Sequence, residues 1–155
     1  MTSIIFLGTL SWKIHCVSAT SRNSEELDPQ EQSERVNIYM AKMANEAIKK
    51  KKFDLSSYEG LQDYYVYLRG HLSLQDVRLQ LSSIKITVKC STLAILEYLW
   101  YEYCSGRLNA EAEKCLITEK VKDELGMETI QLTTTILEED YLACKSSLMA
   151  ILGKF

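Results

Sequence analysis

The sequence contains very little proline and glycine, with one proline and six glycines in 155 residues. Disordered chains are usually rich in these two residues and poor in apolar ones, whereas 46% of this chain is apolar. The chain also lacks any apolar run near the roughly 20 residues that a helix needs to cross a bilayer. Length and composition therefore predict one globular domain with a substantial core and no membrane span.

A strong excess of charge of one sign is missing as well. The 18 basic and 21 acidic residues give a net charge of −3 and are mixed along the chain. Proteins that bind duplex DNA usually concentrate positive charge on one face, and proteins that bind single strands on a sheet expose aromatic side chains there. The strands predicted below carry lysine, arginine, threonine and glutamine on their polar side and no aromatic residue. We therefore expect no nucleic-acid partner.

The residues that enzymes use are scarce. There are two histidines, no glycine-rich phosphate loop and no grouping of Ser, His and Asp. A thiol nucleophile would need His71 to reach Cys90 or Cys104, and both cysteines lie on the apolar side of their local patterns. The acidic run at residues 138–140 is typical of the first turn of a helix, where it complements the helix dipole. We expect a protein that is not an enzyme and that holds no metal ion and no cofactor.

The five cysteines include no CxxC pair and no spacing typical of a metal finger. Four of them fall in segments with an apolar pattern, where a free cysteine behaves as a small buried hydrophobe. These four are Cys90, Cys104, Cys115 and Cys144. Buried free thiols favour a reducing compartment, so the sequence predicts a cytoplasmic protein.

The N-terminal segment allows more than one interpretation. A short apolar run at residues 3–12 is followed by VSA at residues 17–19, which resembles a signal-peptidase site, but no basic residue precedes the run. One alternative is a cleaved signal segment, which would leave a small secreted or thiol-dependent protein with four cysteines. The other is a loose leader, or an edge strand at residues 3–8, followed by a polar linker at residues 20–30. We place the leader and linker at residues 1–28 and the domain at residues 29–155.

Helical spacing of apolar residues predicts five helices. They cover residues 31–50, 58–69, 93–105, 110–125 and 137–151. Side chains of Ser, Thr and Asn commonly cap the start of a helix, and glycine commonly ends one. The predicted caps are Ser57, Ser91 or Thr92, Asn109, and Thr135 in a capping box with Glu138. The predicted ends are Gly70, Gly106 and Gly126.

Strict alternation of apolar and polar residues predicts strands over 76–81, 84–90 and 128–136. Each strand has one apolar face, as in an antiparallel sheet that is covered on one side only. A shift by one residue would expose the whole apolar face of residues 84–90, so we expect this register to be firm. The predicted fold is an α+β two-layer sandwich, with a mainly antiparallel sheet and helices packed on one face. The polar face is expected to carry Arg78, Gln80, Lys85, Thr87, Lys89, Thr129, Gln131 and Thr133.

Two surfaces are candidates for binding a partner protein. The first is the polar sheet face, where the expected contact residues are Arg78, Lys85, Thr87, Lys89 and Gln131. The second is a flank of the helix at 93–105 that carries Tyr98 and Tyr101, because partly exposed aromatics bury a large area at low entropic cost. The alternative for these tyrosines is that they line the core under a neighbouring helix.

The order of the elements between about residues 75 and 152 carries a family resemblance. An alternating strand leads into an aromatic helix and a second helix, in the segment IKITVKCSTLAILEYLWYEYCSGRLNAEAEKCLITEKVKDELG (84–126). A further strand and the acidic start of a closing helix follow, in IQLTTTILEEDYLACKSSL (130–148). These segments resemble the N-terminal domain of the TRADD family and its relatives in invertebrate multidomain proteins.

The resemblance implies an α+β sandwich without catalytic activity. Such a domain is expected to mediate protein–protein assembly in death-receptor and innate-immune signalling, with a TRAF-type adaptor as the partner. No partner-binding residue is carried over from the family, because the match is to the pattern that determines the fold. The candidate contact residues therefore depend on the strand and helix patterns alone.

Overall fold

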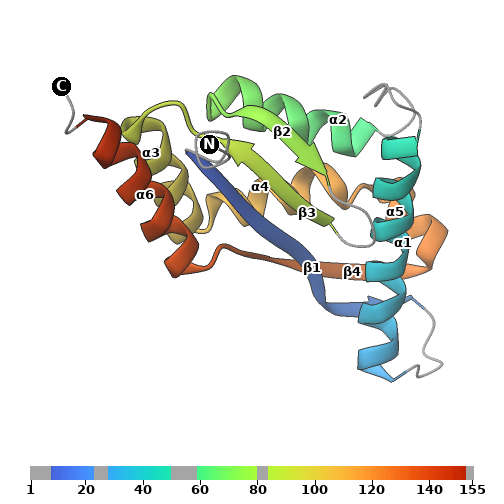
Figure 1. Ribbon diagram of the computed structural model, residues 1–155. Coiled ribbons are helices and arrows are strands. Elements are labelled where there is room, and N and C mark those ends of the chain that lie inside the picture. Colours follow the sequence, from blue (N-terminus) through green and yellow to red (C-terminus); the bar gives the residue numbers. More distant parts are fainter. Residues whose placement is uncertain (1–7, 23–27, 50–58, 80–83, 153–155) are drawn as a thin grey trace.

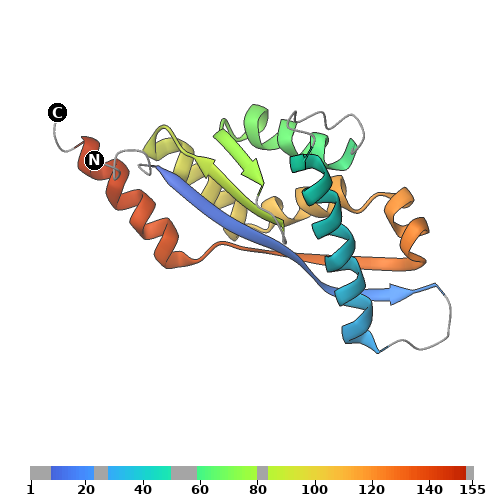
Figure 2. The ribbon, with the colours of Figure 1, turned by 45° about the vertical axis from the view of Figure 1, so that its right-hand side comes forward.

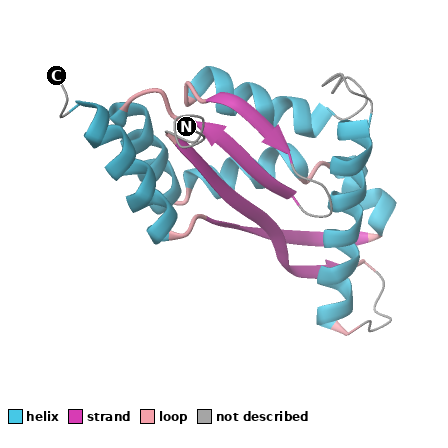
Figure 3. Ribbon diagram, in the orientation of Figure 1, coloured by secondary structure: helices cyan, strands magenta, loops and turns pink. Residues whose placement is uncertain are grey.

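The structure is a computed structural model that describes residues 8–22, 28–49, 59–79 and 84–152 (Figure 1). Four strands form one sheet; one helix crosses in front of the right-hand end of the sheet, and the others lie beside or behind it (Figure 3). No helix in these ranges is long and apolar enough to cross a membrane. The elements are, in chain order, β1 (Thr9–Ser21), α1 (Pro29–Lys49), α2 (Glu59–Val66), the π-helical turn η3 (Tyr67–His71), β2 (Gln75–Leu79), β3 (Ile84–Lys89), α3 (Leu93–Cys104), α4 (Arg107–Leu116), α5 (Glu119–Leu125), β4 (Met127–Thr135) and α6 (Glu138–Leu152).

The sheet has the strand order β2-β3-β1-β4, and every neighbouring pair is antiparallel. Trp12 of β1 lies opposite Ile86 of β3, and Ile14 lies opposite Ile84. Residues that lie directly opposite each other share a face, so the apolar side chains of neighbouring strands gather on one side of the sheet. The predicted α+β sandwich with an antiparallel sheet and helices on one face is confirmed.

Helices α2, α3 and α4 supply the other side of the core. Trp12 is 1% exposed, and its Nε1 donates a hydrogen bond to Oη of Tyr64 in α2, at 3.3 Å. Because both rings are buried, this bond pairs two polar groups that would otherwise be lost from water. Leu99 of α3 and Leu108 of α4 are fully buried in the same apolar cluster.

The strand β1 corrects the interpretation of the N-terminal segment. It pairs with β3 on one side and with β4 on the other, so residues 9–21 form a central strand and not a loose leader. The edge strand predicted at residues 3–8 lies almost entirely outside the described residues. Leu10, Trp12 and Ile14 are buried, while Lys13 and His15 are exposed, which is the period of two of a half-buried strand. The alternation is hidden in the sequence because the apolar residues 4–7, outside the described residues, run directly into it.

The predicted polar linker at residues 20–30 is also shorter than expected. Thr20 and Ser21 belong to β1, and Pro29 begins α1. Residues 23–27 lie outside the described residues. The sheet therefore begins well before residue 29, where the sequence analysis places the start of the domain.

Side chains from the helices satisfy backbone groups where a strand has no neighbour. Where β1 extends beyond β3, Asn37 of α1 accepts a hydrogen bond from the N–H of Cys16 at 2.6 Å and donates one to its carbonyl oxygen at 3.2 Å. On the outer edge of β4, Glu113 accepts from the N–H of Leu132 at 3.1 Å and Asn109 donates to its carbonyl oxygen at 2.8 Å. Unpaired backbone groups at a strand edge destabilise the fold when they are buried, and they can pair with strands of other chains when they are exposed. These side chains satisfy the backbone groups of Cys16 and Leu132, which have no strand neighbour on that side.

The region between β3 and β4 differs from the prediction of one helix capped by Asn109. Helix α4 begins directly after Gly106, and Asn109 faces β4 instead of capping the helix. The helix ends at Leu116, and a second helix, α5, starts after Thr118, whose hydroxyl accepts a hydrogen bond from a first-turn N–H at 3.2 Å. Gly126, with a φ of 66°, ends α5 as predicted.

Two other predicted helix ends are wrong. Gly70 lies inside η3 and does not stop the helix. Thr135 belongs to β4 and forms no capping box with α6, where the carbonyl of Leu137 accepts the first hydrogen bonds instead. Thr92, in contrast, caps α3 as one of the two predicted candidates. The predicted cap Ser57 lies outside the described residues.

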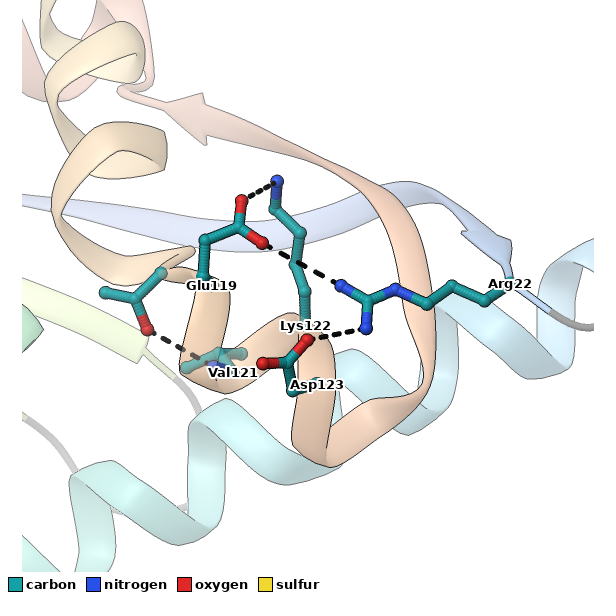
Figure 4. A network of polar contacts seen from close by, with 6 residues as sticks. Arg22, Glu119, Val121, Lys122 and Asp123 are labelled. Atoms are coloured by element: carbon teal, nitrogen blue, oxygen red, sulfur yellow. Dashed lines mark hydrogen bonds and ion pairs between the residues drawn. The ribbon is translucent and has the colours of Figure 1, made fainter.

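Arg22 ties the end of β1 to α5. Its guanidinium lies 2.5 Å from Asp123 and 3.8 Å from Glu119, and Glu119 also pairs with Lys122 at 3.1 Å (Figure 4). Exposed ion pairs of this kind contribute little stability. They connect the end of β1 to α5, and the strand spans the molecule from the side of α6 to the side of α1 (Figure 2).

Candidate interaction surfaces

The register of the sheet places the predicted polar residues on one face. Lys85 of β3 lies opposite Lys13 of β1. Thr87 lies opposite Ser11 on one side, with their hydroxyls 2.9 Å apart, and opposite Arg78 on the other. Alternation along β3 and β4 extends the same face. The face brings together all the sheet residues predicted to contact a partner, Arg78, Lys85, Thr87, Lys89 and Gln131.

The strand β1 adds two residues that the sequence analysis misses on this face, Lys13 and His15. Both are exposed, and they lie opposite Thr135 and Thr133 of β4. The signal that could have found them is the period of two in residues 9–16. Gln80, also predicted here, lies outside the described residues. We define the cationic sheet face as Lys13, His15, Arg78, Lys85, Thr87, Lys89 and Gln131.

The basic side chains of the cationic sheet face form no ion pair with the acidic residues in the described ranges, although Asp76 lies in β2 near Arg78. Neither β1 nor β3 contains an acidic residue. Within the described ranges, no ion pair involves any of its four lysines and arginines. Lys13 and Lys85 are directly opposite, an arrangement in which like charges destabilise a sheet. An anionic group bound here would relieve that repulsion.

A second surface lies on the outward side of α3. Tyr98 and Tyr101 are 39% and 56% exposed, so neither lines the core. Oη of Tyr98 lies 3.2 Å from Nε2 of His71, which follows α2 in η3. The guanidinium of Arg107 lies 6.0 Å from the ring centroid of Tyr101. We define the tyrosine patch as His71, Tyr98, Tyr101 and Arg107.

The carboxylate of Glu102 lies beneath the tyrosine patch, with 2% of its side chain exposed. Tyr67 of η3 donates a hydrogen bond to Oε2 at 3.4 Å. Nη1 of Arg107 lies 3.7 Å from Oε1, beyond hydrogen-bond distance, and Oε1 has no donor among the described residues. Burial, and then the neighbouring Glu102 carboxylate, raise the pKa of Tyr67 above its ordinary value. Sequence patterns gave no sign of this site, because Glu102 looks like an ordinary polar position of a helix.

The cysteines are all free thiols, and four of them are buried. The predicted burial is wrong for Cys104, which is exposed. The thiols of Cys90 and Cys144 form a hydrogen bond, which raises the pKa of Cys90 and lowers that of Cys144. His71 is the histidine that a thiol nucleophile would need, and its ring contacts those of Tyr67 and Tyr98. In the described part of the chain, no three His, Cys, Asp or Glu side chains gather where they could hold a metal ion.

No protein-family model matches the chain, and no solved structure matches it. Part of the chain is similar to the human Death effector domain-containing protein, with 36% identity over 61 residues, which are 39% of this chain and 19% of that protein. The mouse protein of the same name matches with the same values. The human DNA-binding death effector domain-containing protein 2 is 30% identical over 69 residues, 44% of this chain and 21% of that protein. The chain therefore spans about a fifth of the length of these curated relatives.

Proposed function

We propose that the chain is a non-catalytic protein-interaction module of the adaptor type, which binds an acidic segment of a partner protein on the cationic sheet face. The observation that carries the proposal is the group of four basic side chains on an uncovered sheet face, without an acidic residue in β1 or β3. An acidic segment would pair with Lys13 and Lys85 and remove their repulsion. The threonine and glutamine side chains between them would hydrogen bond to the same segment.

A protein partner is favoured over a nucleic acid. The name of one relative includes the words DNA-binding, and a phosphate backbone is also an anion. The chain as a whole is acidic, however, with a net charge of −3, which repels a polyanion at long range. The cationic sheet face also carries no Phe, Tyr or Trp side chain on which an unpaired base could stack.

The finer proposal concerns the signalling context. We infer a role in death-receptor or innate-immune signalling, with a TRAF-type adaptor as the partner. The resemblance of residues 84–148 to the TRADD family supports it, as does the similarity of part of the chain to proteins named for a death effector domain. Five free thiols support a cytoplasmic setting.

The test compares the wild-type chain with two charge-reversal variants. K85E/K89E alters the cationic sheet face, and K114E/K120E makes the same change of charge at exposed lysines of α4 and α5. Proteins captured from lysate by the wild type and by K114E/K120E, but not by K85E/K89E, are purified and their affinities measured by calorimetry. We expect K85E/K89E to bind at least about 10-fold more weakly, with a difference that shrinks as salt is added.

Circular dichroism should show that both variants keep the fold, because Lys89, Lys114 and Lys120 are exposed and Lys85 is only half-buried. Equal affinity of the purified partner for wild type and K85E/K89E would exclude the cationic sheet face. A DNA duplex of about 20 base pairs is tested in parallel, since salt-dependent binding of duplex at physiological ionic strength would replace the protein partner with DNA.

A further inference from the structure

The carboxylate of Glu102 is a buried acceptor that the described residues pair only in part. A carboxylate has about four acceptor positions, and a buried one normally has them filled. Here Oε2 accepts one long hydrogen bond from Tyr67, and Oε1 accepts none among the described residues. Leaving a buried charge in this state is unfavourable unless another donor completes it.

The residues around this carboxylate form an exposed aromatic surface. Tyr98 lies one helical turn before Glu102 on α3 and contacts His71. The ring of His71 stacks on that of Tyr67, with centroids 5.5 Å apart. Both residues belong to η3, and π-helical turns are rare and frequently found at functional sites. The turn places one ring against the buried acid and the other against the exposed tyrosine.

Arg107 indicates which chemical group fits between these residues. Its guanidinium lies between the Tyr101 ring and Oε1 of Glu102, at 6.0 Å and 3.7 Å. It makes no hydrogen bond to the carboxylate, and 62% of its side chain is exposed, so it is held loosely. A guanidinium can stack on an aromatic ring and donate two parallel hydrogen bonds to a carboxylate. A lysine ammonium cannot do both in this planar way.

We propose that the tyrosine patch is a binding site for an arginine side chain of a partner protein, whose guanidinium displaces Arg107, pairs with Glu102 and stacks on Tyr101. The partner segment would carry apolar residues beside this arginine, to cover Tyr98 and His71. The site goes beyond the proposed function, because the tyrosine patch lies on the helical side of the molecule and not on the sheet face. Either proposal can fail without the other.

The test is a titration followed by nuclear magnetic resonance, with a defined probe. The probe is an acetylated and amidated pentapeptide with the sequence GLRLG, added up to about 10 mM so that even millimolar affinity is detected. Its controls carry citrulline, which has the shape of arginine without the charge, or lysine in the central position. We expect the arginine peptide to shift the side-chain signals of Tyr98, Tyr101 and His71. The citrulline and lysine peptides should bind at least about 5-fold more weakly.

Two variants separate a binding site from a structural ion pair. Glu102→Gln should weaken binding of the arginine peptide at least about 10-fold, whereas the control Glu97→Gln on the same helix should not. Arg107→Ala should tighten binding by about 2- to 5-fold, because it removes the internal competitor. A purely structural role for the Arg107–Glu102 pair predicts no tightening. Equal binding of the arginine and citrulline peptides, or no shift at the highest concentration, would overturn the proposal.

Discussion

The reactivity of each thiol depends on the surroundings of that one residue. The thiolate is the reactive form of cysteine, and burial raises the pKa of Cys16 and raises that of Cys115 to about 11. The hydrogen bond between Cys90 and Cys144 lowers the pKa of Cys144, but both thiols are buried and closed to reagent. We predict that iodoacetamide at about pH 8 modifies Cys104 in the folded protein and spares the other four. Peptide mapping by mass spectrometry measures this.

The same experiment in urea is the control. All five cysteines should then react, because unfolding exposes every thiol. Modification of Cys115 at the rate of Cys104 in the folded protein would contradict the described core. A secreted form with two disulfides would instead leave fewer than five reactive thiols in urea.

The exposure of Cys104 shows why a residue on a highly apolar helix is hard to place from sequence. Helix α3 reads LAILEYLWYEYC, so apolar or aromatic side chains surround it and no single face stands out. Leu96 and Leu99, which are three residues apart and share a helix face, enter the core. Tyr98 and Tyr101 point outward. The elements packed against α3 decide which side of the helix faces the core and which is exposed.

At the level of whole elements, helices α2 and α4 approach each other closely at Gly60. A Cβ atom added to Gly60 in α2 would lie 2.3 Å from the backbone oxygen of Cys115 in α4. We predict that Gly60→Ala lowers the free energy of unfolding by about 1–3 kcal/mol, because one of the two backbones has to move. Intrinsic helix propensity acts in the opposite direction and favours alanine. Urea denaturation followed by circular dichroism measures the balance.

Gly70 offers the matched control for this change. No atom lies within 4 Å of a Cβ built there, and η3 continues through it. Gly70→Ala should therefore leave the protein equally stable or up to about 1 kcal/mol more stable, because alanine restricts the unfolded chain. A similar loss at both positions would mean that helix packing at Gly60 is not the cause.

Elements with a strict local pattern were predictable, and those decided by distant contacts were not. The strand β3 and helix α3 follow from alternation and from the Thr92 cap. Asn109 has the chemistry of a helix cap, yet it bonds the edge of β4, which follows only after the whole of α5. An asparagine can do either. Only the position of β4 beside α4 decides which one occurs.

For the whole molecule, the sequence predicted the polar sheet face but not the pair of opposite lysines, Lys13 and Lys85, on it. Each strand alternates, so Arg78, Lys85 and Lys89 could be placed on one side without knowing the strand order. The pair of Lys13 and Lys85 required that order, because it exists only if β1 lies next to β3. The buried state of Glu102 likewise depends on how η3 and α4 meet α3.

The central position of β1 makes the whole fold depend on this N-terminal strand. β4 pairs with no other strand in the sheet order, and β1 buries Leu10, Trp12, Ile14 and Cys16. Burial of such side chains contributes about 1.5–3 kcal/mol each, so four of them approach the roughly 5–15 kcal/mol by which domains are stable. We predict that a chain starting at Thr20, the product of cleavage after Ala19, has no cooperative thermal transition in circular dichroism. Adding a synthetic peptide of residues 8–22 should restore one, and a shortened chain that melts cooperatively by itself would show that the sheet forms without β1.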